Sequence, residues 1–75
     1  MLRAEDVEVG MRVNVKDLWD IIGVAFLLTN FEGEVGEVMY KGEPYTEECD
    51  RIAKEIVSRN SGICFYYDSG EDIVG

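Results

Sequence analysis

The side chains of this sequence that could do chemistry are two thiols and many carboxylates. The thiols belong to Cys49 and Cys64, and 16 of the 75 residues are aspartate or glutamate. A cysteine nucleophile needs a neighbouring base, and the sequence has no histidine to supply one. Two cysteines are also too few for a structural zinc site, which takes about four Cys or His ligands. We therefore expect no enzyme, no cofactor and no metal site.

The carboxylates form several clusters, and one of them could be a binding surface. Glu32, Glu34 and Glu37 are spaced along one expected strand, where they would form an acidic ridge. Such a ridge could contact a basic groove of a partner, and in its extreme form carboxylates on a rigid scaffold stand in for nucleic-acid phosphates. The alternative is that these acids only keep a small protein soluble. No loop has the DxDxDG spacing of an EF-hand, and a glycosidase-type pair could be drawn from any two acids.

The net charge restricts the class of partner. Seven Lys and Arg residues against 16 acids give a formal charge of −9 and a sequence pI near 4.2. Binding a nucleic-acid backbone relies on clustered Lys and Arg side chains that release counterions, and anionic membrane surfaces attract the same cations. The charge therefore argues against both, and the expected partner is a protein with a basic surface.

The aromatic residues are numerous for this length, and we expect most of them to fill the core. Besides three phenylalanines they are Trp19, Tyr40, Tyr45, Tyr66 and Tyr67. Trp19 and Tyr45 are the candidates for exposure, because side by side they would make a surface on which a peptide could dock. The candidate binding residues are thus Glu32, Glu34, Glu37, Trp19 and Tyr45.

The most apolar stretch is IIGVAFLL at 21–28. A membrane-spanning helix needs about 20 such residues, so this run is expected in the core. If it is not fully covered, we expect a homodimer, since so short a chain has little with which to cover it. The first residues lack the hydrophobic segment of a signal peptide, which predicts a cytoplasmic protein with two buried free thiols.

The length predicts one domain over residues 1–75. Strict alternation of apolar and polar residues predicts a strand over 11–15. Residues 17–30 are ambiguous: a short helix or turn is favoured over 16–22, with Asp17 as a cap, and the remainder stays open between helix and strand. Residues 31–40 read as a strand with a bulge at Gly36 and Glu37, which keeps Glu37 in water.

The clearest element is a helix from Thr46 to Arg59, after a turn around Pro44. Its apolar stripe recurs at helical spacing, and three acid-first pairs four residues apart are expected on its surface, from Glu47 to Arg51, Asp50 to Lys54 and Glu55 to Arg59. A strand over 62–67 follows, then a hairpin turn at 68–70 and a short strand over 71–74.

The order of these elements resembles the small SH3-like barrels. The resemblance rests on the opening VxVGMRVxV, on the GEVGEV run at 33–38, which is similar to the strand of KOW-type modules, and on the closing FxYDSGEDIV. It covers most of the chain except the helix at 46–59, which would be an insertion between barrel strands. The resemblance and the helix together predict an α+β fold: a small, strongly bent antiparallel sheet or SH3-like barrel of four to five strands, with one amphipathic helix packed on it. Such barrels bind RNA, DNA or short peptides, so the alternative function is nucleic-acid binding through Arg12 and Lys16.

Overall fold

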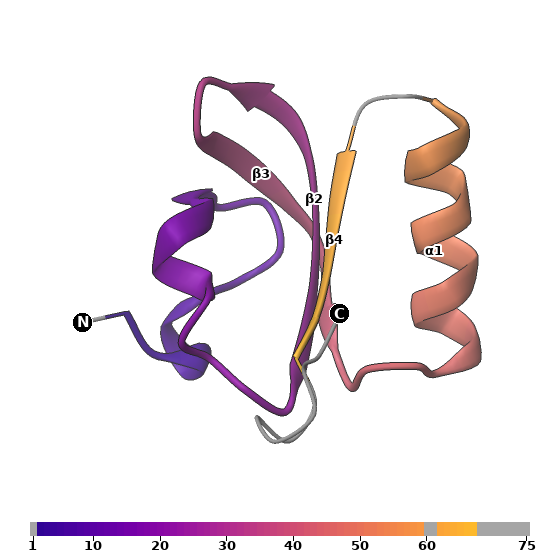
Figure 1. Ribbon diagram of the computed structural model, residues 1–75, viewed down its shortest axis with the longest axis horizontal. Coiled ribbons are helices and arrows are strands. Elements are labelled where there is room, and N and C mark those ends of the chain that lie inside the picture. Colours follow the sequence, from indigo (N-terminus) through magenta and orange to yellow (C-terminus); the bar gives the residue numbers. More distant parts are fainter. Residues whose placement is uncertain (1, 60–61, 68–75) are drawn as a thin grey trace.

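A twisted antiparallel sheet separates the two layers of this protein. The computed structural model describes residues 2–59 and 62–67, with side chains placed through residue 59. The strands are β1 (Arg12–Asn14), β2 (Val24–Glu32), β3 (Val35–Gly42) and β4 (Gly62–Tyr67), and they lie in the order β1-β3-β2-β4. The single α-helix of the described residues, α1 (Glu47–Ser58), covers one face (Figure 1).

The other face is covered by residues 2–22, which we call the N-terminal layer (Figure 1). It contains two short 3-10 helices, η1 (Ala4–Asp6) and η2 (Val15–Leu18), and between them the chain passes through β1, an edge strand of the sheet itself. Buried side chains of this layer form one apolar cluster with the sheet, made of Val7, Val13, Leu18, Ile21, Phe26, Leu28 and Val38. A second cluster joins the opposite face to α1 and consists of Ala25, Leu27, Cys49, Ala53 and Ile56.

The central strand β2 is buried on both faces. Phe26 and Leu28 belong to the cluster of the N-terminal layer, and Ala25 and Leu27 belong to the cluster under α1. All four side chains are fully buried. Adjacent residues of a strand point to opposite faces, so a strand covered on both sides requires an uninterrupted apolar run. This explains why helical and strand patterns could not be told apart over 17–30.

The segment 31–40, predicted as one strand, contains the turn between β2 and β3. Gly33 and Glu34 form this turn, and Gly33 has a φ of 64°, a left-handed conformation that glycine adopts without steric cost. The register of β2 and β3 shifts by one residue at Met39 and again between Thr29 and Glu32, whose partners are Glu37 and Val35. The second irregularity falls at the bulge predicted around Gly36 and Glu37, but the extra residue belongs to β2, where Asn30 and Phe31 lie opposite Gly36.

The helix α1 confirms the prediction over 46–59 to within one residue at each end. Thr46 is the N-cap, and its hydroxyl accepts a hydrogen bond from the Cys49 N–H at 3.1 Å. The buried side of the helix consists of Cys49, Ala53 and Ile56, with Ile52 half-buried, whereas Val57 is exposed.

One of the three predicted ion pairs on α1 is present. Arg59 lies 3.0 Å from Glu55. Arg51 instead approaches Glu48, at 3.9 Å, one turn away at the other spacing that places two side chains on the same helix surface. The pairs that do not form among these described side chains are Glu47 with Arg51 and Asp50 with Lys54.

The fold class is confirmed as α+β, with one helix packed on an antiparallel sheet, but the barrel is not. Strands β1 and β4 are the two edges of the sheet formed by the described residues, so it is open. β1 is shorter than the predicted strand at 11–15 because the chain enters η2 at Val15. The cap of η2 is Asn14 rather than Asp17: its side chain accepts the Lys16 N–H at 2.9 Å. The predicted turn at 68–70 and strand at 71–74 lie outside the described residues.

Candidate functional site

The three acids of the predicted ridge gather where β2 turns into β3. Glu32 ends β2, Glu34 lies in the turn and Glu37 belongs to β3. Each carboxylate already contacts a polar side chain. The contacts are Glu32 with Arg12 at 3.2 Å, Glu34 with Lys16 at 3.2 Å, and Glu37 with the Asn30 amide at 3.1 Å. The ridge is therefore not an array of unengaged carboxylates.

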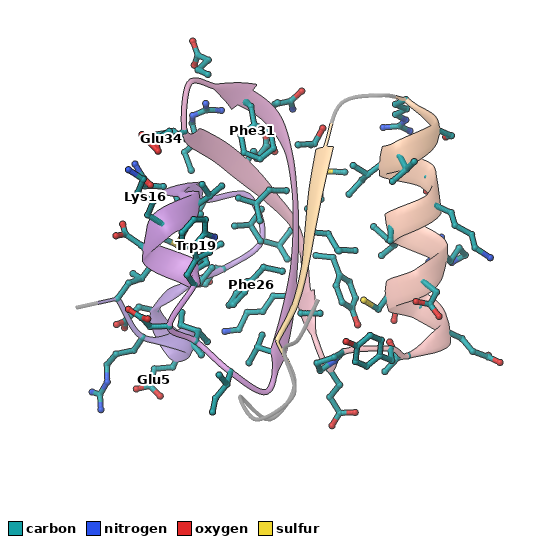
Figure 2. All side chains as sticks on the ribbon, viewed as in Figure 1. Glu5, Lys16, Trp19, Phe26, Phe31 and Glu34 are labelled. Atoms are coloured by element: carbon teal, nitrogen blue, oxygen red, sulfur yellow. The ribbon has the colours of Figure 1, made fainter. Side chains whose placement is uncertain are left out.

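Arg12 and Lys16, the candidate nucleic-acid contacts, are the cations that neutralise this ridge. Figure 2 shows Lys16 beside Glu34, at the end of the molecule where the β2–β3 turn meets the N-terminal layer. Arg12 also donates to the Asn30 carbonyl at 3.4 Å. Both ion pairs are exposed to solvent, so each contributes at most about 1 kcal/mol. Each pair joins one positive and one negative group, so these four side chains together add no net charge to this end of the sheet.

Trp19 and Tyr45 are both exposed, as predicted, but they are not neighbours. Trp19 is 53% exposed and follows η2 in the N-terminal layer, on the face of the sheet away from α1 (Figure 2). Tyr45 is 61% exposed and lies in the loop between β3 and α1, at a φ of 64°. The two rings thus come from different parts of the fold, the N-terminal layer and the loop that leads from β3 into α1.

A tight turn presents Trp19 to solvent. The Ile21 N–H donates to the Leu18 carbonyl at 3.1 Å, which places Trp19 and Asp20 at the two central positions of the turn. Leu18 and Ile21, the residues at its two ends, are buried in the apolar cluster beneath the layer. Ile22, the next residue, is 53% exposed. The buried ends hold the turn on the sheet, and its tip faces water.

The cations of the protein are largely engaged with other groups. Five of the seven Lys and Arg residues form ion pairs, which are those of Arg3, Arg12, Lys16, Arg51 and Arg59. Lys41 donates to the Val7 carbonyl at 2.9 Å and joins β3 to the N-terminal layer. Lys54 is exposed and has no ion pair with a described residue.

Many carboxylates, by contrast, have no cation beside them. Among the residues with described side chains, seven exposed acids form neither an ion pair nor a side-chain hydrogen bond: Asp6, Glu8, Asp17, Asp20, Glu43, Glu47 and Asp50. The first four belong to the N-terminal layer, which also exposes Val9, Trp19 and Ile22. The last three lie next to or within the first turn of α1, where the positive end of the helix dipole favours them.

The thiol of Cys49, the cysteine whose side chain the structure describes, has the surroundings of a core residue. Cys49 is fully buried in the apolar cluster under α1, as predicted; the side chain of Cys64 lies outside the described part. Within residues 2–59, no three acidic or cysteine side chains are grouped so that they could hold a metal ion. None of the helices described is both long enough and apolar enough to cross a membrane.

The apolar run that could have favoured a homodimer is largely covered within one chain. Its strand part, from Ala25 to Leu28, is fully buried between the two layers. Ile22 is the large apolar side chain of this run that remains exposed. Because residues 25–28 are covered within one chain, they give no reason to expect a homodimer.

Sequence reasoning found Trp19 but missed the residues that the structure places around it. The sequence patterns assign Asp17 to a cap and give no role to Asp20 or Ile22. The available signal was the spacing of Leu18 and Ile21: if both face the core, the residues between them must point outward. The cross-strand partners Arg12 and Glu32 are 20 residues apart, and no local pattern joins them.

No protein-family model, curated protein or solved structure matches this chain. The resemblance to SH3-like and KOW-type modules therefore stays a prediction from sequence. The function has to be inferred from the arrangement of the side chains alone.

Proposed function

We propose that this chain is a small non-catalytic binding domain that docks on a basic surface of a protein partner, as an adaptor or an inhibitor. The observation that carries the proposal is the charge imbalance of the described side chains. Seven exposed carboxylates have no cation beside them, while nearly every cation is engaged by a carboxylate or a carbonyl. Such a surface attracts a cationic partner over long range and accelerates its association.

Exposed apolar side chains supply the short-range contact that charge does not. Trp19 and Ile22 are each 53% exposed, although such residues are usually buried in a protein core. Aromatic side chains are over-represented at protein interfaces because they bury a large area at a small cost in conformational entropy. We place the domain in the cytoplasm, where a thiol such as that of Cys49 stays reduced.

Binding of nucleic acid receives less support from the same contacts. A phosphate backbone would have to compete with Glu32 for Arg12 and with Glu34 for Lys16. The unpaired acids on both layers would also repel the phosphates. We therefore retain a protein partner as the conclusion.

The test is capture on the immobilised chain from a nuclease-treated lysate, followed by binding measurements with each purified protein that is retained. We expect a protein with a basic surface whose dissociation constant rises as salt is raised from about 50 to 300 mM, because the Debye length shrinks over this range. Short duplex DNA and single-stranded RNA serve as parallel probes at low salt. The proposal fails if only nucleic acid binds, or if the retained proteins bind with no dependence on salt.

A further inference from the structure

The geometry points to the turn from Asp17 to Ile22 as the contact surface, and to an arginine-containing segment of the partner as its ligand. This inference rests on the proposed function and goes further, because it names both the surface and the chemistry that it recognises. We call residues 17–22 the tryptophan turn.

The tryptophan turn is held rigidly enough to act as a preformed contact. Its backbone is closed by the hydrogen bond from the Ile21 N–H to the Leu18 carbonyl at 3.1 Å, and the preceding turn by that from Trp19 to Lys16 at 3.4 Å. Leu18 is fully buried and Ile21 is 8% exposed, so both ends are anchored in the core. A partner would therefore lose little binding energy to ordering this segment.

The carboxylates of the tryptophan turn are not paired with any cation of the described residues. Asp17 and Asp20 are exposed and form no ion pair within the described residues. Lys16, the base nearest to them in the sequence, is directed to Glu34 at 3.2 Å. An incoming cation thus meets, within one short segment, an exposed indole ring and two carboxylates that form no ion pair among the described residues, and it displaces no existing ion pair of theirs.

Arginine suits this arrangement better than lysine. A guanidinium group is planar, it stacks on the face of an aromatic ring, and tryptophan is the best ring for such cation–π contacts. Its fork of N–H donors can bind a carboxylate bidentately at the same time. Ile22 adds an exposed aliphatic surface, so we expect apolar residues beside the arginines of the ligand.

The competing surface is the entrance to α1, where Tyr45 is exposed close to Glu43 and Glu47. Two features make it the weaker candidate. Tyr45 already interacts with another group of the protein. Glu47 and Asp50 lie in the first turn of α1 and are stabilised by the helix dipole, so they have a role within the fold. This surface provides the matched control.

The test uses the isotope-labelled full chain and a blocked peptide of repeated Gly-Arg-Leu as the probe. The chain has a single tryptophan, so the indole N–H of Trp19 gives one isolated NMR signal. We expect this signal and the amide signals of residues 17–22 to shift on titration, with the signals of residues 45–50 unchanged. Replacing the arginines of the probe by citrulline, which keeps the shape and removes the charge, should abolish the shifts.

Variants of matched charge then locate the contact. We expect Trp19→Ala, and separately Asp17→Asn with Asp20→Asn, to weaken probe binding about tenfold, as for central interface residues. Glu47→Gln with Asp50→Asn changes the net charge equally and should alter the affinity by less than about twofold. Tyr45→Ala is the aromatic control. Amide spectra of each variant verify that the fold is retained, which the exposure of these side chains favours.

The outcomes separate this inference from the proposed function. If the shifts and the affinity losses map to residues 43–50, the tryptophan turn is the wrong surface, while a basic partner is still supported. If a captured partner binds with salt dependence but tolerates Trp19→Ala and the Asp17/Asp20 variant, the inference is again overturned and the proposed function stands. If neither the probe nor any basic protein binds, both fail.

Discussion

The ammonium group of Lys16 lies 3.2 Å from a carboxylate oxygen of Glu34, and this ion pair ties the N-terminal layer to the turn between β2 and β3. The neighbouring pair of Arg12 and Glu32 has the same separation. All four side chains remain open to water, so the attraction is weakened by solvent and by dissolved salt. The two ion pairs therefore contribute little to the stability of the fold. Their main effect is to position the four charged groups.

Removing the Lys16–Glu34 pair should change stability only slightly. A double-mutant cycle with Lys16→Ala and Glu34→Ala, measured by urea unfolding, should give a coupling energy below about 1 kcal/mol that falls further in high salt. A coupling above about 2 kcal/mol that salt does not alter would contradict the exposed position of this pair.

Lys41 should be the lysine whose removal destabilises the protein. Its ammonium group donates to the Val7 carbonyl at 2.9 Å in a partly buried position, and hydrogen bonds from charged groups contribute about 1.5–3 kcal/mol when well shielded. We expect Lys41→Met to lower the free energy of unfolding by about 1–2 kcal/mol, because the contact is only partly buried. Lys54→Met is the matched control, since Lys54 is exposed and lacks an ion pair with a described residue. Equal urea midpoints for the two variants would refute the role of Lys41.

The contribution of the N-cap of α1 to the free energy of unfolding should also be measurable by urea unfolding. Thr46→Ala removes the acceptor for the Cys49 N–H and should destabilise the protein by about 1 kcal/mol. Thr46→Ser keeps a hydroxyl and should restore most of this loss. Ser58→Ala serves as a second control, because Ser58 is exposed and its hydroxyl donates to the Glu55 carbonyl near the end of the helix. Loss of stability in the serine variant equal to that in Thr46→Ala would argue against the cap.

The helix could be predicted from sequence because its signals are local. The threonine cap, the acids of the first turn and the apolar spacing from Cys49 to Ile56 all lie within a few residues of one another. The turn at Gly33 could not be predicted in this way. Gly33 and Gly36 each suit a break in an alternating strand, and the choice between them depends on how β2 and β3 pair.

The candidate site was predictable only in part for the same reason. That Trp19 is exposed could be expected, but its separation from Tyr45 follows from the sheet that lies between the two layers. The neutralisation of the acidic ridge depends on contacts between Arg12 and Glu32, which are 20 residues apart in the chain. Long-range pairings of this kind are set by tertiary packing, and no local pattern contains them.

The junction of β4 with α1 leaves no room for a side chain at position 62. Gly62 pairs with Thr29, and a Cβ atom placed on it would lie 2.6 Å from the Leu28 carbonyl oxygen and would clash with the side chain of Ile56. The backbone oxygen cannot turn away as a side chain can. We therefore expect Gly62→Ala to lower the free energy of unfolding by about 1–3 kcal/mol, the range found for overpacked cores.

Gly36→Ala is the control for this last prediction, because the three atoms nearest to a Cβ at position 36 would all belong to the ring of Phe31, the first of them 2.7 Å away. That ring can move aside, so the cost should be smaller. The double variant Gly62→Ala with Ile56→Ala should not regain stability, since the clash with Leu28 persists and the second change also leaves a cavity in the core. Urea unfolding measures all three variants. If Gly62→Ala proves no more destabilising than Gly36→Ala, β4 is not held against α1 as closely as described.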